Sequence, residues 1–327
     1  MAVKFIIDSA SDVLPSECKK LGAIHVPMTV RFGDKEFADA VDLSHKKFYK
    51  MLTSGKEEHP TTSQVTPAAW AEAMEEATRD GDTAVVITLS SRLSGTYQSA
   101  CIAAEDFEGK VFVVDSMTAT IGERLLLQYG VRLAADGLDA AAIAQRLDEV
   151  KSRIRLYGRI DTLEYLKKGG RIGAASAVVG TMLNIKPIIS VQDGVVQNVG
   201  KARGAKMADK QVRDLVAKAG GIDFSKPMCA VYSGLEDDKI VYFLHHTETG
   251  PDGREKAKTI GKMLDEKLTV EGCFDIVIYC QDHKFFTQSN GQSTAKSPEG
   301  MFDLEMNNDL KQIDVAIRDF WNLGGDK

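Results

Sequence analysis

Several features that would assign this chain to a specialised class of protein are missing from its sequence. Its longest apolar runs are far shorter than the roughly 18 residues that a membrane-spanning helix needs. The five cysteines are scattered and form no C-x-x-C pair, which favours reduced thiols over a disulfide framework or a metal site. The first residues show no charged segment followed by an apolar one, so they predict no signal peptide. We therefore expect a cytoplasmic protein without stable membrane insertion.

The chain also lacks an excess of positive charge and the common catalytic signatures. Its formal net charge is -6, with basic and acidic residues mixed, which argues against a nucleic-acid partner and against adhesion to anionic membranes. The motifs H-E-x-x-H, G-x-S-x-G and G-x-x-x-x-G-K-[ST] are absent. Among the six histidines only His245 and His246 are close in sequence, and on a strand they would face opposite ways. No catalytic residue, metal site or cofactor is therefore predicted.

The first half of the chain alternates short apolar runs with helical patterns. Apolar runs of strand length lie at residues 4–8, 84–90 and 110–116. Helical patterns cover residues 15–22, 67–81, 94–107, 121–137 and 139–154, the first ending at Gly22 and the second beginning at Pro67. Strands that alternate with helices predict an α/β fold, with a largely parallel sheet covered on both faces.

The pattern changes after about residue 155, where we place a domain boundary. A short helix at 163–173 and an apolar helix at 174–185 precede a hairpin at 186–204 that turns at Asp193-Gly194, and a helix at 205–219 follows. Later patterns predict a helix near 253–268 and a strand at 274–280. We expect an N-terminal α/β domain (1–155), a second α/β domain (156–290), and a polar linker with a terminal helix (291–327).

The segment SSRLSGTYQSA (90–100) directly follows the predicted strand at 84–90. A hydroxyl-rich turn that opens a helix presents free backbone N–H groups at the carboxyl edge of the sheet, where α/β proteins bind ligands and where helix N-termini favour anions. Ser94 suits either an N-cap or a ligand donor. The four hydroxyls at Ser90, Ser91, Ser94 and Thr96 favour a binding site.

A second hydroxyl cluster, TTSQVT (61–66), lies between Pro60 and Pro67, which hold it extended before a helix. By itself it is typical of a helix entry. Together with the first cluster it could direct two hydroxyl donors at one oxyanion. Hydroxyls bind a carboxylate without burying a full positive charge, so the desolvation cost is lower.

Carboxylates follow two of the predicted strands, at DSASD (8–12) and at Asp115. Asp8, Asp12 and Asp115 could form a metal or acid/base site, which leaves open an enzyme acting on a phosphorylated or acyl substrate. They could equally cap the following helices, and we favour that structural role.

Taken together, these motifs resemble the DegV family of bacterial fatty-acid-binding proteins. The similar segments occur in the family's order over roughly the first 235 residues: DSASD (8–12), TTSQVTP (61–67), SSRLSGTYQSA (90–100), VDS (114–116), TLEYLKKGGRIG (162–173), LNIKPII (183–189) and KARG (201–204). The resemblance implies a two-domain α/β fold with an acyl chain buried in the first domain. It also implies a carrier that performs no chemistry and presents the lipid to a separate fatty acid kinase.

Residue by residue, the resemblance places Thr62 and Ser94 at the carboxylate-binding hydroxyls. Arg171 in GGRIG and Arg203 in KARG match basic positions linked to the headgroup or to kinase docking, and Ser63 and Gly95 are further candidate contacts. The bound ligand would be a long-chain fatty acid such as palmitate. The family's closing His-x-Gly-Pro-Gly string is absent, and HHTETGPDG (245–253) resembles it only loosely.

Overall fold

The computed structural model describes residues 2–172 and 184–221, with short strands and single residues between 247 and 316. The chain forms two compact units, residues 1–222 and 223–327, and the first carries every site residue discussed below. The predicted three-part division at residues 155 and 290 stays a prediction.

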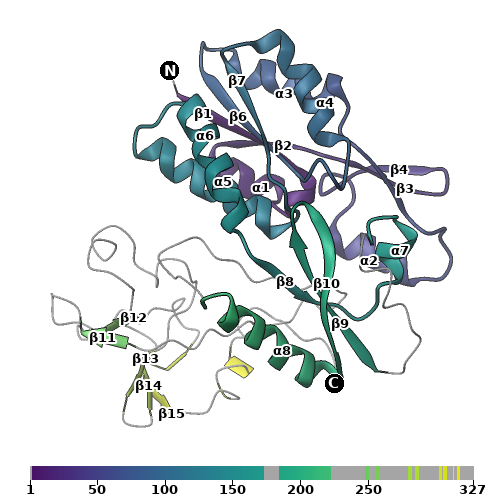
Figure 1. The fold of residues 1–327 in the computed structure, drawn as a ribbon, viewed down its shortest axis with the longest axis vertical. Helices are drawn as coiled ribbons and strands as arrows, with labels where there is room; N and C mark the ends of the chain where they lie inside the picture. Colours follow the sequence, from purple (N-terminus) through teal and green to yellow (C-terminus); the bar gives the residue numbers. More distant parts are fainter. Residues whose placement is uncertain are drawn as a thin grey trace. The chain divides into compact units, whose positions relative to one another are not determined.

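The first unit is built on a four-stranded parallel sheet with the strand order β2-β1-β6-β7 (Figure 1). Its strands are β1 (Val3–Asp8), β2 (Ala23–Val26), β6 (Thr83–Thr88) and β7 (Val111–Asp115). β1 pairs with β2 and β6, and β6 pairs with β7. The strands predicted at 4–8, 84–90 and 110–116 are confirmed as β1, β6 and β7. Because all four strands are parallel, the turns after β1, β6 and β7 meet at one edge of the sheet.

Apolar side chains cover both faces of this sheet. Along β1, Phe5 and Ile7 point into the same core cluster as Leu126 of α5 (Ile121–Ala135) and Leu147 of α6 (Ala140–Val150). The intervening Ile6 faces the opposite cluster, together with Trp70 of α3 (Pro67–Thr78) and residues of α4 (Thr96–Ala104). The alternation of side chains along a strand thus produces two cores from one apolar run.

Helix ends follow the local signals in most places. α1 (Pro15–Leu21) ends at Gly22, which has φ 66° and caps the helix in the left-handed conformation. α3 begins at Pro67 as predicted but ends at Thr78 rather than near residue 81. The helix predicted for 94–107 is α4, which begins only at Thr96, followed by the 3₁₀ turn η2 (Glu105–Phe107). Similarly, α6 ends at Val150, and the 3₁₀ turn η3 (Lys151–Arg153) continues it.

The sequence patterns did not predict a small antiparallel sheet, in the order β4-β3-β5, and the helix α2 (His45–Thr53). β2 and β3 (Thr29–Phe32) follow each other closely in the chain but belong to different sheets. Pro27, whose backbone has no N–H to donate, lies between them. β4 (Lys35–Ala38) and β5 (Thr61–Ser63) pair with β3 on either side. β5 carries Thr62 opposite Val30 of β3.

The third sheet, in the order β10-β9-β8, completes the first unit. Strands β9 (Ile185–Gln192) and β10 (Val195–Arg203) form the predicted hairpin, and both turn residues, Asp193 and Gly194, have positive φ. β8 (Leu156–Arg159) was not predicted, whereas α7 (Glu164–Lys168) and α8 (Ala205–Lys218) were. Of the helix predicted for 174–185, residues 174–183 lie outside the described residues and Ile185 begins β9.

The remaining described elements are β11 (Thr247–Thr249), β12 (Glu255–Ala257), β13 (Tyr279–Gln281), β14 (Lys284–Phe286) and β15 (Glu305–Asn307). β12 shows that the helix predicted near 253–268 is wrong at residues 255–257. β13 overlaps the end of the strand predicted at 274–280. Within the polar linker and terminal helix expected at 291–327, residues 291–300 and most of the helix lie outside the described residues. In the described parts of the chain, no helix is long and apolar enough to cross a membrane.

Candidate functional site

The loop between β6 and α4 lies where the strands of the parallel sheet end, and it is held by hydrogen bonds from several turns. Leu89 donates its N–H to Oδ2 of Asp8 at 2.9 Å, and the Ser90 N–H donates to the Thr118 carbonyl at 2.8 Å. Within the loop, the Leu93 and Ser94 N–H groups donate to the Ser90 carbonyl. Residues 90–94 therefore form a compact turn with a fixed shape.

Ser94 is not the N-cap of α4; Gly95 occupies that position and has no side chain to cap with. The Ser94 Oγ accepts a hydrogen bond from the Thr96 N–H at 3.3 Å and lies 2.9 Å from the Thr96 Oγ1. Thr96 is fully buried, and either of the two hydroxyls can be the donor in this contact. With Thr96 as the donor, Ser94 accepts two hydrogen bonds, and its own half-buried O–H is available to a ligand.

The structure brings the two hydroxyl segments together. The Gln64 side chain packs directly over Gly95, so that a Cβ at Gly95 would collide with Gln64 Oε1. Ser99 of α4 donates to the Val65 carbonyl at 2.6 Å in a buried hydrogen bond, which ties the same segment to the helix. Thr62, on β5, lies two residues before Gln64, and its side chain is exposed.

The tip of the β9–β10 hairpin docks on the same loop. Ser90 Oγ donates to the Gly194 carbonyl at 2.8 Å, and Arg92 Nη1 donates to the Asp193 carbonyl at 2.9 Å. A Cβ at Gly194 would lie 2.5 Å from Ser90 Oγ and 3.1 Å from the Met117 methyl group, so only glycine permits this approach. The sequence reasoning did not assign a role to Arg92, although it stands inside the SSRLSG string.

The two candidate arginines occupy different places. Arg171 is exposed and donates from Nε to the Leu93 carbonyl at 3.0 Å and from Nη1 to the Gly169 carbonyl at 2.6 Å. It therefore steadies its own glycine loop and also contacts the residue beside Ser94. Arg203 is exposed at the end of β10 remote from the hairpin tip, about 27 Å along the strand at about 3.4 Å per residue.

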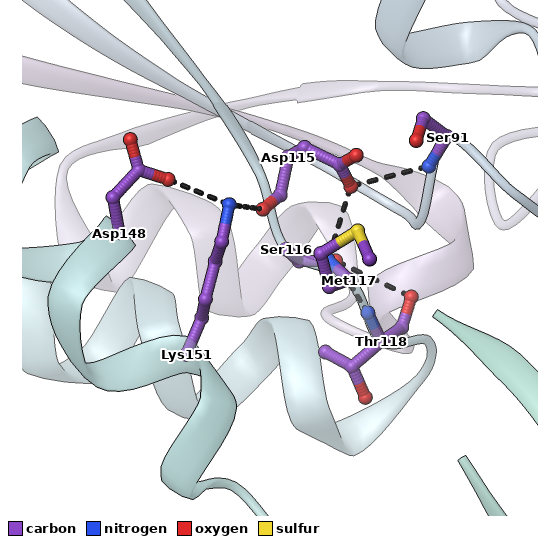
Figure 2. A network of polar contacts seen from close by, with 7 residues as sticks. All are labelled: Ser91, Asp115, Ser116, Met117, Thr118, Asp148 and Lys151. Atoms are coloured by element: carbon purple, nitrogen blue, oxygen red, sulfur yellow. Dashed lines mark hydrogen bonds and ion pairs between the residues drawn. The ribbon is translucent and has the colours of Figure 1, made fainter. Parts of the chain in front are cut away.

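Asp115, at the end of β7, has its carboxylate engaged with backbone (Figure 2). Its Oδ1 accepts from the Ser91 N–H at 3.1 Å and from the Met117 N–H at 3.0 Å. Lys151 Nζ donates to the Asp115 carbonyl at 2.8 Å and pairs with Asp148 at 2.7 Å. Asp115 thus fixes the turn after β7 against the Ser90–Ser94 loop.

The turn after β1 has the capping role that the sequence analysis favoured. Asp8 caps the 3₁₀ turn η1 (Ser9–Ser11) through Oδ1, which accepts from the Ala10 N–H at 2.9 Å. Asp12 has φ 56° and ends this turn. Burial raises the pKa of Asp8 and that of Asp12 to about 6 each, and nearby Asp39 adds to both shifts.

The alternative of an enzyme with Asp8, Asp12 and Asp115 at one site gains no support from this geometry. The Asp8 and Asp115 carboxylates each receive two backbone N–H groups of the surrounding turns. Nowhere in the described ranges do three His, Cys, Asp or Glu side chains gather in a way that could hold a metal ion.

Comparison with known proteins decides the family. The family model described as "Uncharacterised protein, DegV family" matches residues 2–264. The chain belongs to the DegV family. A DegV domain-containing protein of Deinococcus radiodurans is 38% identical over 245 residues, which cover 74% of this chain and 86% of that protein. Another, from Caldanaerobacter subterraneus, is 35% identical over 225 residues, covering 68% and 79%. The resemblance and the α/β fold that the sequence predicted are confirmed.

Solved DegV structures share the fold of this chain. A DegV family protein of Thermus thermophilus, described by its fatty acid binding, aligns with a TM-score of 0.62 and 32% identity over 67% of this chain and 78% of its own. A stearic-acid-binding protein of Eubacterium ventriosum aligns with a TM-score of 0.61 and 28% identity over 67% and 76%. The Fak B3 protein of Streptococcus pneumoniae, loaded with linoleic acid, shares the fold at 24% identity, with a TM-score of 0.59 over 67% and 79%.

Proposed function

We propose that this DegV protein binds a long-chain fatty acid such as palmitate as a non-catalytic carrier, with Thr62 and Ser94 donating hydrogen bonds to the carboxylate. The observation that carries the proposal is the contact of Gln64 with Gly95, which joins the two hydroxyl segments at the carboxyl edge of the parallel sheet. The fatty-acid-binding proteins of T. thermophilus and E. ventriosum, similar in sequence and fold, support the choice of ligand.

The chemistry of the loop suits a carboxylate. The Ser94 O–H is available when Thr96 donates to its oxygen, and exposed Thr62 needs no buried partner. Burial of an acyl chain contributes about 0.8 kcal/mol per methylene, so a chain of about sixteen carbons supplies over ~10 kcal/mol before entropy costs. Few polar contacts are then needed at the headgroup, and two hydroxyls are enough to orient it.

The test is a titration with labelled palmitate, preceded by mass spectrometry of lipid released from freshly purified, denatured protein. We expect a co-purified long-chain fatty acid and nanomolar to micromolar affinity. Ser94→Ala and Thr62→Ala should each weaken binding by roughly ten- to hundredfold, because a hydrogen bond to a charged group contributes about 1.5–3 kcal/mol.

Ser91→Ala is the matched control in the same loop, because Ser91 contributes its backbone N–H rather than its hydroxyl to the Asp115 carboxylate. It should leave the affinity unchanged. If the Ser94 and Thr62 variants bind palmitate like the wild type, the headgroup assignment is wrong. If purified protein carries no lipid and binds none, the carrier function itself is wrong.

The proposal extends to presentation of the bound lipid to a fatty acid kinase, which the sequence resemblance implies. Exposed Arg203, remote from the hairpin tip, is the candidate for contact with an acidic surface of the kinase. Arg203→Ala should lower acyl-phosphate formation in a reconstituted assay with kinase and ATP while palmitate affinity stays unchanged. An equal loss of both would place Arg203 at the lipid instead.

A further inference from the structure

Two carboxyl groups lie against each other beneath the Ser90–Ser94 loop, and the proposed headgroup contacts use neither of them. Asp8 ends β1 and Glu123 stands in the first turn of α5, and both are completely buried. Neither Glu123 oxygen has a hydrogen-bond partner among the described residues, and the two carboxyl groups influence each other's pKa. A hydrogen bond between two carboxyl groups requires a proton on one of them.

The surroundings decide which group carries the proton. Asp8 accepts from the N–H groups of Ala10 and Leu89, both at 2.9 Å, which favours its ionised form. The Glu123 oxygens meet no donor in good geometry among the described residues; the nearby Thr120 N–H already donates to the Ala10 carbonyl at 2.9 Å. Of the two groups, Glu123 is therefore the one better suited to carry a proton and to donate it to the Asp8 carboxylate.

The other charged groups around the pair support this assignment. Burial, followed by the negative charges of Asp8 and Asp12, raises the pKa of Glu123 well above its ordinary value. Asp39 also faces Asp8 with a negative charge. The positive groups nearby are Arg124, which pairs with Glu17, and His45; both lower the pKa of Asp12 rather than that of Glu123.

The pair is joined directly to the proposed binding loop. Asp8 Oδ2 holds the Leu89 N–H, and the next residue, Ser90, contacts the hairpin tip and anchors the turn that carries Ser94. We propose that Asp8 and Glu123 are positioning residues: they share one proton and together hold the Ser90–Ser94 loop in the form that binds a carboxylate. The ligand in this inference rests on the proposed function, whereas the proton-sharing pair does not.

Ionisation of Glu123 would place two negative charges side by side without water, and the loop would separate from β1 to relieve them. Palmitate affinity should therefore fall as the pH rises past the raised pKa of Glu123. Glu123→Gln keeps the shape and donates an amide N–H to Asp8 at every pH. Glu123→Leu removes the donor and leaves the Asp8 carboxylate buried without it.

The experiment measures palmitate affinity from about pH 6 to about pH 9 for the wild type and both Glu123 variants. We expect Glu123→Gln to bind within about twofold of the wild type at neutral pH and to lose the decline at high pH, while Glu123→Leu binds about tenfold more weakly. If the side chain at position 123 only fills space, the Gln and Leu variants will bind palmitate equally well and will show the same pH profile as the wild type. That result would overturn the inference.

A ligand-free measurement separates this inference from the carrier function. Carboxyl-¹³C NMR of the unliganded protein should show Glu123 protonated at neutral pH, and the Leu89 amide should be protected from exchange in the wild type and in Glu123→Gln. An ionised Glu123, or an exposed Leu89 amide, would refute the pair even if palmitate binds. A protonated Glu123 in a protein that binds no fatty acid would support the pair and refute the proposed function.

Discussion

Gly194→Ala tests whether the hairpin tip is docked on the binding loop. Gly194 has φ 76°, and a Cβ there would lie 2.5 Å from Ser90 Oγ. The left-handed backbone costs an alanine about 1–2 kcal/mol. Overpacking adds about 1–3 kcal/mol, and loss of the hydrogen bond from Ser90 adds about 1 kcal/mol. We expect a total loss of about 3–6 kcal/mol in the free energy of opening the loop.

Gly81→Ala provides the matched control, because Gly81 has φ 78° and nothing lies within 4 Å of the position of its Cβ. It carries the backbone cost alone, about 1–2 kcal/mol. The difference between the two variants therefore isolates the docking of the tip, at about 2–4 kcal/mol.

The assay is hydrogen exchange followed by mass spectrometry on peptides that cover the Ser90–Ser94 loop and the hairpin tip. Gly194→Ala should accelerate exchange in both peptides together, and Gly81→Ala should change neither. Palmitate affinity should fall in the first variant alone. Equal exchange in the two variants would show that the tip is not docked, and the loop would then need another explanation for its fixed shape.

Two further predictions concern protons in the same region. Burial raises the pKa of Asp8 and of Asp12 from 3.8 to about 6, so the folded state retains protons that the unfolded state releases. The free energy of unfolding should therefore fall as the pH rises from about 4 to about 6, by up to about 3 kcal/mol per group at 1.36 kcal/mol per pKa unit. Urea unfolding at several pH values measures this, and Asp8→Asn should reduce the slope; a steeper slope in that variant would contradict the shift. Thr96→Val removes the hydroxyl that contacts Ser94 Oγ, so Ser94 loses its partner inside the loop and the direction of its O–H is no longer fixed. Palmitate should then bind about fivefold more weakly. Unchanged affinity would show that the Ser94 O–H is available to the ligand without Thr96.

Local patterns were enough to predict the main elements of the first unit. Strand β1 could be recognised because an apolar run flanked by a helix entry is typical of a buried parallel strand. The hairpin turn at Asp193-Gly194 was predictable because few residue pairs adopt positive φ twice in succession. The short strands β4, β5 and β8 were missed because three or four residues carry too little periodicity to identify.

The assignment of Thr62 and Ser94 as carboxylate-binding residues stays a prediction. Ser94 lies in the loop that follows β6, as its place after a predicted strand suggested, whereas Thr62 lies on β5 of the small antiparallel sheet. Helix capping was ambiguous by sequence, and the start of α4 at Thr96 shows that Ser94 lies before the cap. Arg92 and Glu123 were missed, since an exposed loop arginine and an acidic residue in the first turn of a helix are common and need no function.

The sequence alone determined the class of fold, the turn residues and the family, because these depend on neighbours along the chain. Only the tertiary structure decided which turns meet. Asp8 and Leu89 are 81 positions apart and Ser90 and Gly194 are 104 apart, yet each pair shares a hydrogen bond. Parallel pairing of β1, β6 and β7 gathers their ends at one edge, and burial there changes the protonation of Asp8 and Glu123. Burial and long-range contact depend on packing, and no local pattern encodes them.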